Sequence, residues 1–126
     1  MPKLKLIVLA ALMIPGAALA AERTVTFLCK LEELPENCAR EFEVGEKRLL
    51  AWRKGAEVRV VVNRCPHFNV PMNVEFGTVP VFGGLLTCVH HYSYFRFEDG
   101  ACVEGQCVGA SLDAVAFHVA NGEVVV

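Results

Sequence analysis

The chain has 126 residues, of which 54% are hydrophobic and 21% are charged. This is the composition of one globular domain, and it excludes a disordered chain or a fibre. Twelve basic residues are outnumbered by fourteen acidic ones, which gives a net charge of −2. A protein that binds nucleic acid through its phosphates has an excess of basic residues, so we expect no nucleic-acid partner.

The first twenty residues have the layout of a secretory signal peptide. Lys3 and Lys5 form a short positive region, an uncharged apolar run follows, and an A-x-A cleavage pattern ends at Ala20. We predict that residues 1–20 are a cleaved signal peptide, or that residues 4–21 form an uncleaved N-terminal membrane anchor. The protein is then exported, periplasmic or membrane-anchored. If the start codon is assigned too far upstream, the protein is cytoplasmic instead.

From residue 22 to residue 126 the sequence indicates one domain of short strands separated by turns. Asn121-Gly122 lies between the last two apolar runs, and this dipeptide is a strong hairpin signal. We predict an antiparallel all-β domain with one polar or helical turn at 30–37. The predicted strands are 24–29, 39–44, 48–53, 58–63, 85–88, 94–97, 114–119 and 123–126.

Two short motifs combine residue types that bind metals. Cys65-Pro66-His67 follows a predicted strand, and Cys88-Val89-His90-His91 follows another after a gap of twenty residues. Two cysteines and two histidines suit either a tetrahedral zinc ion or a 2Fe–2S cluster in which two imidazoles replace two thiolates. The order Cys then His in each motif differs from the usual zinc spacing and favours the iron–sulfur cluster. The C-x-x-H spacing favours His91 over the adjacent His90.

With these motifs the chain resembles the Rieske-type ferredoxins of the Rieske 2Fe–2S family over about residues 23–126. The resemblance is carried by 27–35 as the opening strand and turn, 63–67 and 85–91 as two cluster loops, and 112–126 as the closing hairpin. It implies a small antiparallel β-sandwich or barrel of the Rieske type. Two loops would form a cluster-binding part at about residues 64–102.

The same resemblance implies the cofactor, its ligands and a function. The cofactor is a 2Fe–2S cluster, with Cys65 and Cys88 on the buried iron and His67 and His91 on the outer iron. The protein is then a one-electron carrier between a reductase and a terminal oxygenase or oxidase, with no catalytic residues of its own. Two alternatives stay open: a structural zinc domain on the same four residues, and a non-catalytic small subunit of a larger oxidoreductase.

Some residues depart from the family's pattern. Asn69–Gly84 makes the gap between the motifs longer than usual. We expect it to be an extended apolar loop that packs over the cluster or faces a partner. Tyr92 stands where the family often has glycine, and Gly105-Gln106 stands where it often has Gly-Pro.

Four further cysteines lie outside the two motifs, at Cys29, Cys38, Cys102 and Cys107. In an exported protein the close spacing of Cys102 and Cys107 allows a disulfide between them. In a cytoplasmic protein all four remain thiols. Four cysteines allow three pairings, and the sequence does not choose among them.

The resemblance also predicts a low reduction potential. High-potential members carry an extra cysteine in each cluster loop, where this chain has Val70 and His90. Ser93 matches a serine whose hydroxyl raises the potential, whereas Phe95 replaces a tyrosine that also raises it. We expect voltammetry to give a value toward the lower end of the family's range of about −150 to +300 mV. A value well above the middle of that range would contradict this prediction.

Overall fold

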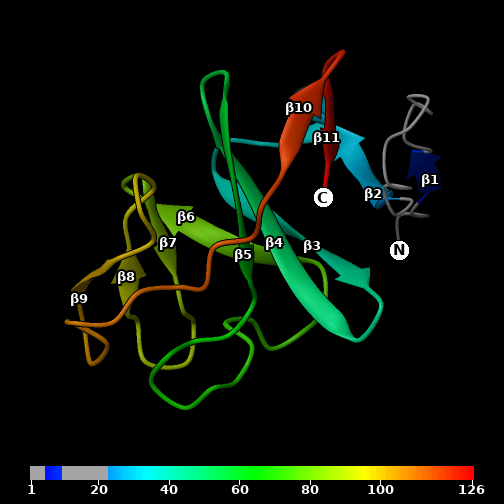
Figure 1. Cartoon of the computed structure of the whole chain (residues 1–126). Helices are drawn as coiled ribbons and strands as arrows, with labels where there is room; N and C mark the ends of the chain where they lie inside the picture. Colours follow the sequence, from blue (N-terminus) through cyan, green and yellow to red (C-terminus); the bar gives the residue numbers. More distant parts are fainter. Residues whose placement is uncertain (1–4, 10–22) are drawn as a thin grey trace, which may run out of the picture.

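Two antiparallel sheets make up the computed structural model, which describes residues 5–9 and 23–126 (Figure 1). The first sheet has the order β1-β2-β11-β10 and contains Lys5–Leu9 (β1), Arg23–Lys30 (β2), His118–Ala120 (β10) and Glu123–Val125 (β11). The second has the order β5-β4-β3-β6-β7-β8-β9 and contains Cys38–Val44 (β3), Lys47–Lys54 (β4), Glu57–Val62 (β5), Thr78–Phe82 (β6), Leu85–Thr87 (β7), Tyr94–Phe95 (β8) and Cys102–Glu104 (β9). A 3-10 turn, Leu31–Glu33 (η1), follows β2. The predicted all-β fold class is confirmed.

Strand β4 is buried on both faces, and it separates two hydrophobic cores. Successive side chains of a strand point to opposite faces of the sheet. Leu49 of β4 accordingly belongs to a core with Leu28 of β2 and Val124 of β11, which joins the two sheets. Leu50 and Trp52 belong to the other core. That second core also contains Cys65, Met72, Val79, Leu86, Cys88, Phe95 and Cys107. The loops that carry the two cysteine motifs are therefore anchored in a packed interior.

Most strands of the sequence prediction are present, with ends that differ by at most two residues. The predicted Asn-Gly hairpin is also present. Asn121 and Gly122 have φ angles of 53° and 72°, and Ala120 pairs with Glu123 across them. Two consecutive positive φ angles are what a tight two-residue hairpin turn requires.

The prediction of a loop throughout Asn69–Gly84 is wrong for its second half. Residues 78–82 form β6, which pairs with β3 on one side and with β7 on the other. Pro80 has no backbone N–H and argues against a central strand on sequence grounds. The strand forms because Val79 is completely buried in the core, and because β3 lies alongside it from a distant part of the sequence.

The prediction of a strand over Ala114–Val119 is also largely wrong, because only His118–Ala120 is a strand there. The preceding residues run beside β5 instead. The Val115 N–H donates to the Val60 carbonyl at 2.9 Å. This hydrogen bond directs the segment along β5 and leaves only its end to form the closing hairpin. Strand β9, which the sequence analysis did not predict, is three residues long.

Part of the predicted leader is strand β1. It pairs antiparallel with β2, from Lys5 opposite Phe27 to Leu9 opposite Arg23. The remainder of the predicted signal peptide or anchor lies outside the described residues, so the leader stays a prediction. Within residues 5–9 and 23–126, no helix is long and apolar enough to cross a membrane.

Candidate metal centre

The two cysteine motifs fold into loops with the same backbone pattern. In the first loop the Cys65 carbonyl accepts from Asn69 N–H and Cys65 N–H donates to Val70, both at 2.7 Å. In the second, the Cys88 carbonyl accepts from Tyr92 N–H and Cys88 N–H donates to Ser93, both at 2.9 Å. Each cysteine therefore closes its own loop with bonds to residues four and five positions later.

The repeated pattern shows which backbone conformation Tyr92 adopts at the position where the family often has glycine. Asn69 and Tyr92 occupy the same place in their loops and have φ angles of 56° and 54°. Asparagine tolerates this left-handed conformation, whereas a bulky residue such as tyrosine is strained in it. Tyr92 thus adopts the backbone conformation for which glycine is suited, and the loop keeps its shape.

The structure brings the four predicted ligand residues together, with thiols inside and imidazoles outside. Cys65 and Cys88 are each 2% exposed, and their side chains interact. His67 is half-buried and His91 is exposed. Their ring centroids lie 4.9 Å apart with the planes nearly perpendicular. The thiols are thus buried and the imidazoles lie nearer the surface, and the assignment of these four residues as ligands stays a prediction.

The Cys65 thiol is held in its protonated form in the free chain. Burial, aided by the neighbouring Cys88 and Cys107 thiols, raises the pKa of Cys65 to about 12, against the lowering effect of a backbone hydrogen bond at His67. A metal is bound by the thiolate and not by the thiol. Metal binding would therefore release the Cys65 proton.

A 2Fe–2S cluster and a single metal ion place different demands on these side chains. Among the described residues, no group of three or more Cys, His, Asp or Glu side chains is placed to hold one metal ion. A cluster of the Rieske type instead takes two protein ligands on each of two irons. The chain offers such pairs in the two thiols and the two imidazoles.

Ser93 supplies an independent sign that the site fits a cluster. Its hydroxyl is buried and, within the described part of the chain, is the one such side-chain polar atom without a hydrogen-bond partner. An unpaired buried hydroxyl costs free energy. The Ser93 backbone is bonded to Cys88, so a sulfur acceptor held by the two loops would give this hydroxyl its partner.

A third loop, 105–110, covers the two ligand loops. The resemblance indicated a covering loop at Gly105-Gln106, but Cys107 was not recognised as part of the site from the sequence. Gly105 packs so closely on Ser93 that a Cβ atom there would lie 2.7 Å from Ser93 Cα. Cys107 Sγ lies 3.6 Å from Cys65 Sγ. Gly105 follows the family's pattern, but nothing in the sequence shows that Cys107 reaches the first motif.

The structure contains no Cys102–Cys107 disulfide, because the two sulfurs face different groups. Cys102 Sγ donates to the Glu104 carbonyl at 3.2 Å. Cys107 Sγ faces Cys65, as described above. All six cysteines, which lie within the described residues, are free thiols.

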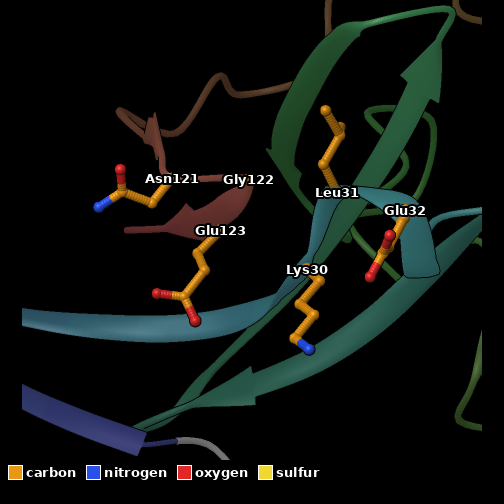
Figure 2. Close-up of a pocket in the computed structure, with 6 residues that line it drawn as sticks. All are labelled: Lys30, Leu31, Glu32, Asn121, Gly122 and Glu123. Atoms are coloured by element: carbon orange, nitrogen blue, oxygen red, sulfur yellow. The ribbon is translucent and has the colours of Figure 1, made fainter.

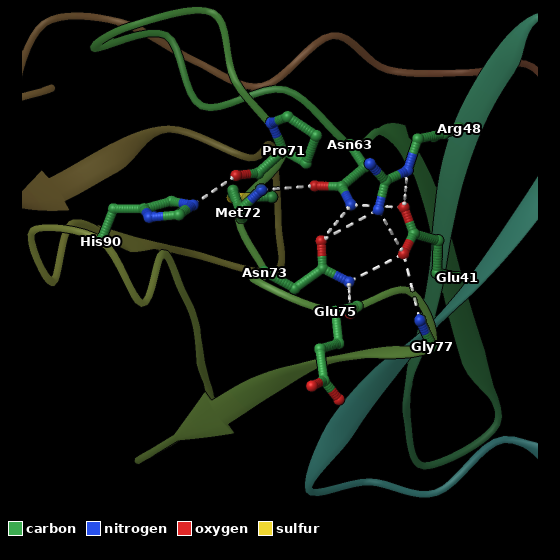
Figure 3. A network of polar contacts seen from close by, with 9 residues as sticks. All are labelled: Glu41, Arg48, Asn63, Pro71, Met72, Asn73, Glu75, Gly77 and His90. Atoms are coloured by element: carbon green, nitrogen blue, oxygen red, sulfur yellow. Dashed lines mark hydrogen bonds and ion pairs between the residues drawn. The ribbon is translucent and has the colours of Figure 1, made fainter.

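A buried carboxylate below the first loop, Glu41 of β3, is a second feature that the sequence analysis missed (Figure 3). Its oxygens accept hydrogen bonds from the Arg48 guanidinium, the Asn63 and Asn73 amides and the Gly77 N–H. Asn63 lies two residues before Cys65, and Asn73 lies just beyond the loop. The network therefore ties both ends of the first loop to the centre of the second sheet.

Two further hydrogen bonds in Figure 3 complete this support. The Asn63 side-chain oxygen accepts from Met72 N–H at 2.8 Å, which closes the base of the first loop. The His90 ring nitrogen Nε2 lies 2.9 Å from the Pro71 carbonyl oxygen. His90, adjacent to the predicted ligand His91, thus connects the second loop to the segment that follows the first.

A pocket of about 510 Å³ lies away from these loops, beside the closing hairpin (Figure 2). It is lined by Lys30, Leu31, Glu32, Asn121, Gly122 and Glu123. In Figure 1 the hairpin and the cluster loops lie toward opposite ends of the molecule. No predicted site residue lines this pocket.

The structure is a small all-β domain in which two cysteines and two histidines from two loops form a candidate metal site. The family model of the Rieske [2Fe-2S] domain matches residues 24–120. The chain therefore belongs to the Rieske [2Fe-2S] domain family, and its cofactor is a 2Fe–2S cluster. A comparison with curated proteins found no match.

Solved structures show the same fold. The ferredoxin of carbazole 1,9a-dioxygenase from Nocardioides aromaticivorans IC177 aligns with a TM-score of 0.64 at 19% identity, over 79% of this chain and 94% of that one. A chain from the complex of reduced oxygenase and oxidized ferredoxin in carbazole 1,9a-dioxygenase aligns with a TM-score of 0.66 at 20% identity, over 79% and 99%. In a carbazole-bound oxygenase and ferredoxin complex, the match has a TM-score of 0.67 at 21% identity. It covers 80% of this chain and 27% of a longer one.

Substituting Glu41 tests the network below the first loop. Burial alone would raise the pKa of Glu41, but the hydrogen bonds from Arg48, Asn73, Asn63 and Gly77 hold it below its ordinary value. The ionised Glu41 therefore stabilises the folded protein. This stabilisation is complete above the unfolded-state pKa of about 4.3 and is lost as pH falls through the lower pKa of the folded state. We expect Glu41→Gln to lower the free energy of unfolding by about 3 kcal/mol near neutral pH.

The loss should shrink as pH falls below about 4, because the wild-type carboxylate is then protonated too. Thermal or urea unfolding of samples with equal iron content measures both effects. Glu43→Gln, an exposed carboxylate on the same strand, is the matched control and should change little. If Glu41→Gln lowers the free energy of unfolding by the same amount at every pH, the prediction is contradicted.

Alanine at Gly105 should damage the site more than alanine at Gly109. Both glycines have positive φ angles, of 106° and 100°, but a Cβ at Gly109 meets nothing within 4 Å. Both variants should lose about 1–3 kcal/mol from backbone strain. Only Gly105→Ala should also displace Ser93 and alter the EPR spectrum of the reduced cluster. Identical spectra for the two variants would show that the contact with Ser93 is unimportant.

Proposed function

We propose that the domain is a one-electron carrier that passes electrons from a reductase to a terminal oxygenase or oxidase. The observation that carries this proposal is the pair of imidazoles at the surface above two buried thiols, in a chain of the Rieske family. When bound, the 2Fe–2S cluster supplies a centre that takes up and gives back one electron. The similarity in fold to a ferredoxin and to a chain of an oxygenase–ferredoxin complex supports an oxygenase partner.

In this proposal the four residues of the two motifs are the cluster ligands. Cys65 and Cys88 hold the inner iron in the hydrophobic core, where water is excluded. His67 and His91 hold the outer iron at the molecular surface. Because electron transfer slows steeply with distance, the exposed imidazole side is the one that a partner would approach.

The surface around the histidines has the composition of a protein contact. Phe68 is 59% exposed, and its ring lies 3.9 Å from the His67 ring and 5.4 Å from the His91 ring, centroid to centroid. Tyr92 is 58% exposed on the second loop, and Val70 is exposed at the end of the first. Exposed aromatic side chains are enriched in protein interfaces. We therefore propose that the exposed apolar rim formed by Phe68, Val70 and Tyr92 is the surface that meets the redox partner.

The domain is proposed to act with partners and to catalyse no reaction alone. Its fold also occurs within longer chains, so a role as a non-catalytic part of a larger oxidoreductase remains the second candidate. Purification of the natural complex distinguishes a stable large subunit from a transient partner. The proposed location, outside the cytoplasm or at the membrane, rests on the leader sequence alone.

Neighbouring histidines give a direct test of the ligand assignment. His91→Ala should lose the 2Fe–2S signal and most of the bound iron, because the outer iron would keep one imidazole. His90→Ala removes the hydrogen bond to Pro71 and should keep the cluster, with some loss of stability. Iron and sulfide content with EPR of the reduced protein measures both. Retention of the cluster in His91→Ala and its loss in His90→Ala would overturn the assignment.

Substituting one exposed phenylalanine tests the proposed partner surface. Phe68→Ala should slow electron transfer to the oxygenase component of carbazole 1,9a-dioxygenase by about tenfold, the effect of a contact worth ~1.4 kcal/mol. Stopped-flow absorbance measures this rate. Phe82→Ala removes a similarly exposed ring from the end of β6 and is the matched control. Oxidation by ferricyanide needs no protein contact, so its rate should change little in either variant. Equal rates of electron transfer to the oxygenase from Phe68→Ala and the wild type would contradict the proposal.

A further inference from the structure

The thiol of Cys107 lies against the thiol of Cys65 inside the core. The two sulfurs are 3.6 Å apart, and both residues are buried. A thiol is a weak hydrogen-bond donor, and a sulfur is a weak acceptor. In the free chain either sulfur can be the donor of this contact.

Binding of the cluster removes this ambiguity. A cysteine that coordinates iron has lost its proton, so the bound Cys65 sulfur can only accept. Cys107 is then the one member of the pair with a proton to give. We propose that Cys107 donates an S–H hydrogen bond to the sulfur of Cys65 and thereby raises the reduction potential of the bound cluster. This inference rests on the proposed role of Cys65 as a cluster ligand.

The third loop holds Cys107 firmly in this position. The Cys107 carbonyl accepts from Ala110 N–H at 2.8 Å, and the Ala110 carbonyl accepts from Cys102 N–H at 2.9 Å. Gly105, at the start of the loop, is packed on Ser93. Because Cys107 is buried within the core, water does not compete for its thiol.

The direction of the effect follows from charge. Reduction makes the cluster and its thiolate ligands more negative, and a hydrogen bond to a charged acceptor is stronger than one to a neutral acceptor. A donor to a ligand sulfur therefore stabilises the reduced form more than the oxidised form. Hydrogen bonds to the sulfurs are among the factors that set iron–sulfur potentials. The Phe95 ring, also buried in this core, carries no hydrogen-bond donor that could take this role.

Three substitutions separate hydrogen bonding from packing. Cys107→Ala removes the donor and should shift the potential to more negative values, by up to about a tenfold change in the reduction equilibrium, or ~59 mV for one electron. Cys107→Ser keeps a donor of similar size and should stay near or above the wild-type value. Cys102→Ala removes another buried thiol of the same region, which faces the Glu104 carbonyl, and should leave the potential unchanged.

A second measurement observes the Cys107 thiol directly in the wild-type protein. In the redox-difference infrared spectrum of the intact protein, an S–H stretching band should move to lower frequency on reduction, and this band should be missing in Cys107→Ser. An unchanged potential in Cys107→Ala, or a redox spectrum without such a band, would overturn the inference. The same samples are assayed for iron and sulfide. Failure of the wild type to hold a 2Fe–2S cluster would instead refute the proposed function itself.

Discussion

The two motif loops meet at the buried side chains of Cys65 and Cys88, which interact with each other. Each cysteine closes its own loop through hydrogen bonds to residues four and five positions later, and both belong to one hydrophobic core. The two histidines project from loops of the same shape, which brings their rings to 4.9 Å at the surface. Burial of the thiols and exposure of the imidazoles thus follow from one packing arrangement.

This arrangement depends on polar groups that lie beneath it. A carboxylate as buried as Glu41 is stable only when its oxygens are paired, and its partners are the side chains that bracket the first loop. Removing a proposed ligand changes the chemistry of the centre directly. We expect removal of Glu41 to change it indirectly, by loosening the loop that presents Cys65 and His67. The loop 105–110 acts from the other side, through its contacts with Ser93 and Cys65.

Sequence patterns predicted the local features well. Apolar runs and turn residues indicated the hairpins, and the spacing of the two motifs indicated the four residues that the fold brings together. The features that were missed depend on distant segments. Strand β6 forms against β3 despite Pro80, and Cys107 meets Cys65 through the fold of a loop more than thirty residues away. Glu41 alternates with the apolar Phe42 as a surface residue would. It is nevertheless buried, and Arg48 of β4, Asn63, Asn73 and the Gly77 N–H donate hydrogen bonds to it.

The most direct test of the account is the iron and acid-labile sulfide content of the purified protein, together with the EPR spectrum of its reduced form. We predict two irons and two sulfides per chain with a Rieske-type signal, since the cluster has two iron atoms with unlike ligands. A colourless protein that carries zinc or no metal after anaerobic preparation would contradict the assignment of an electron carrier.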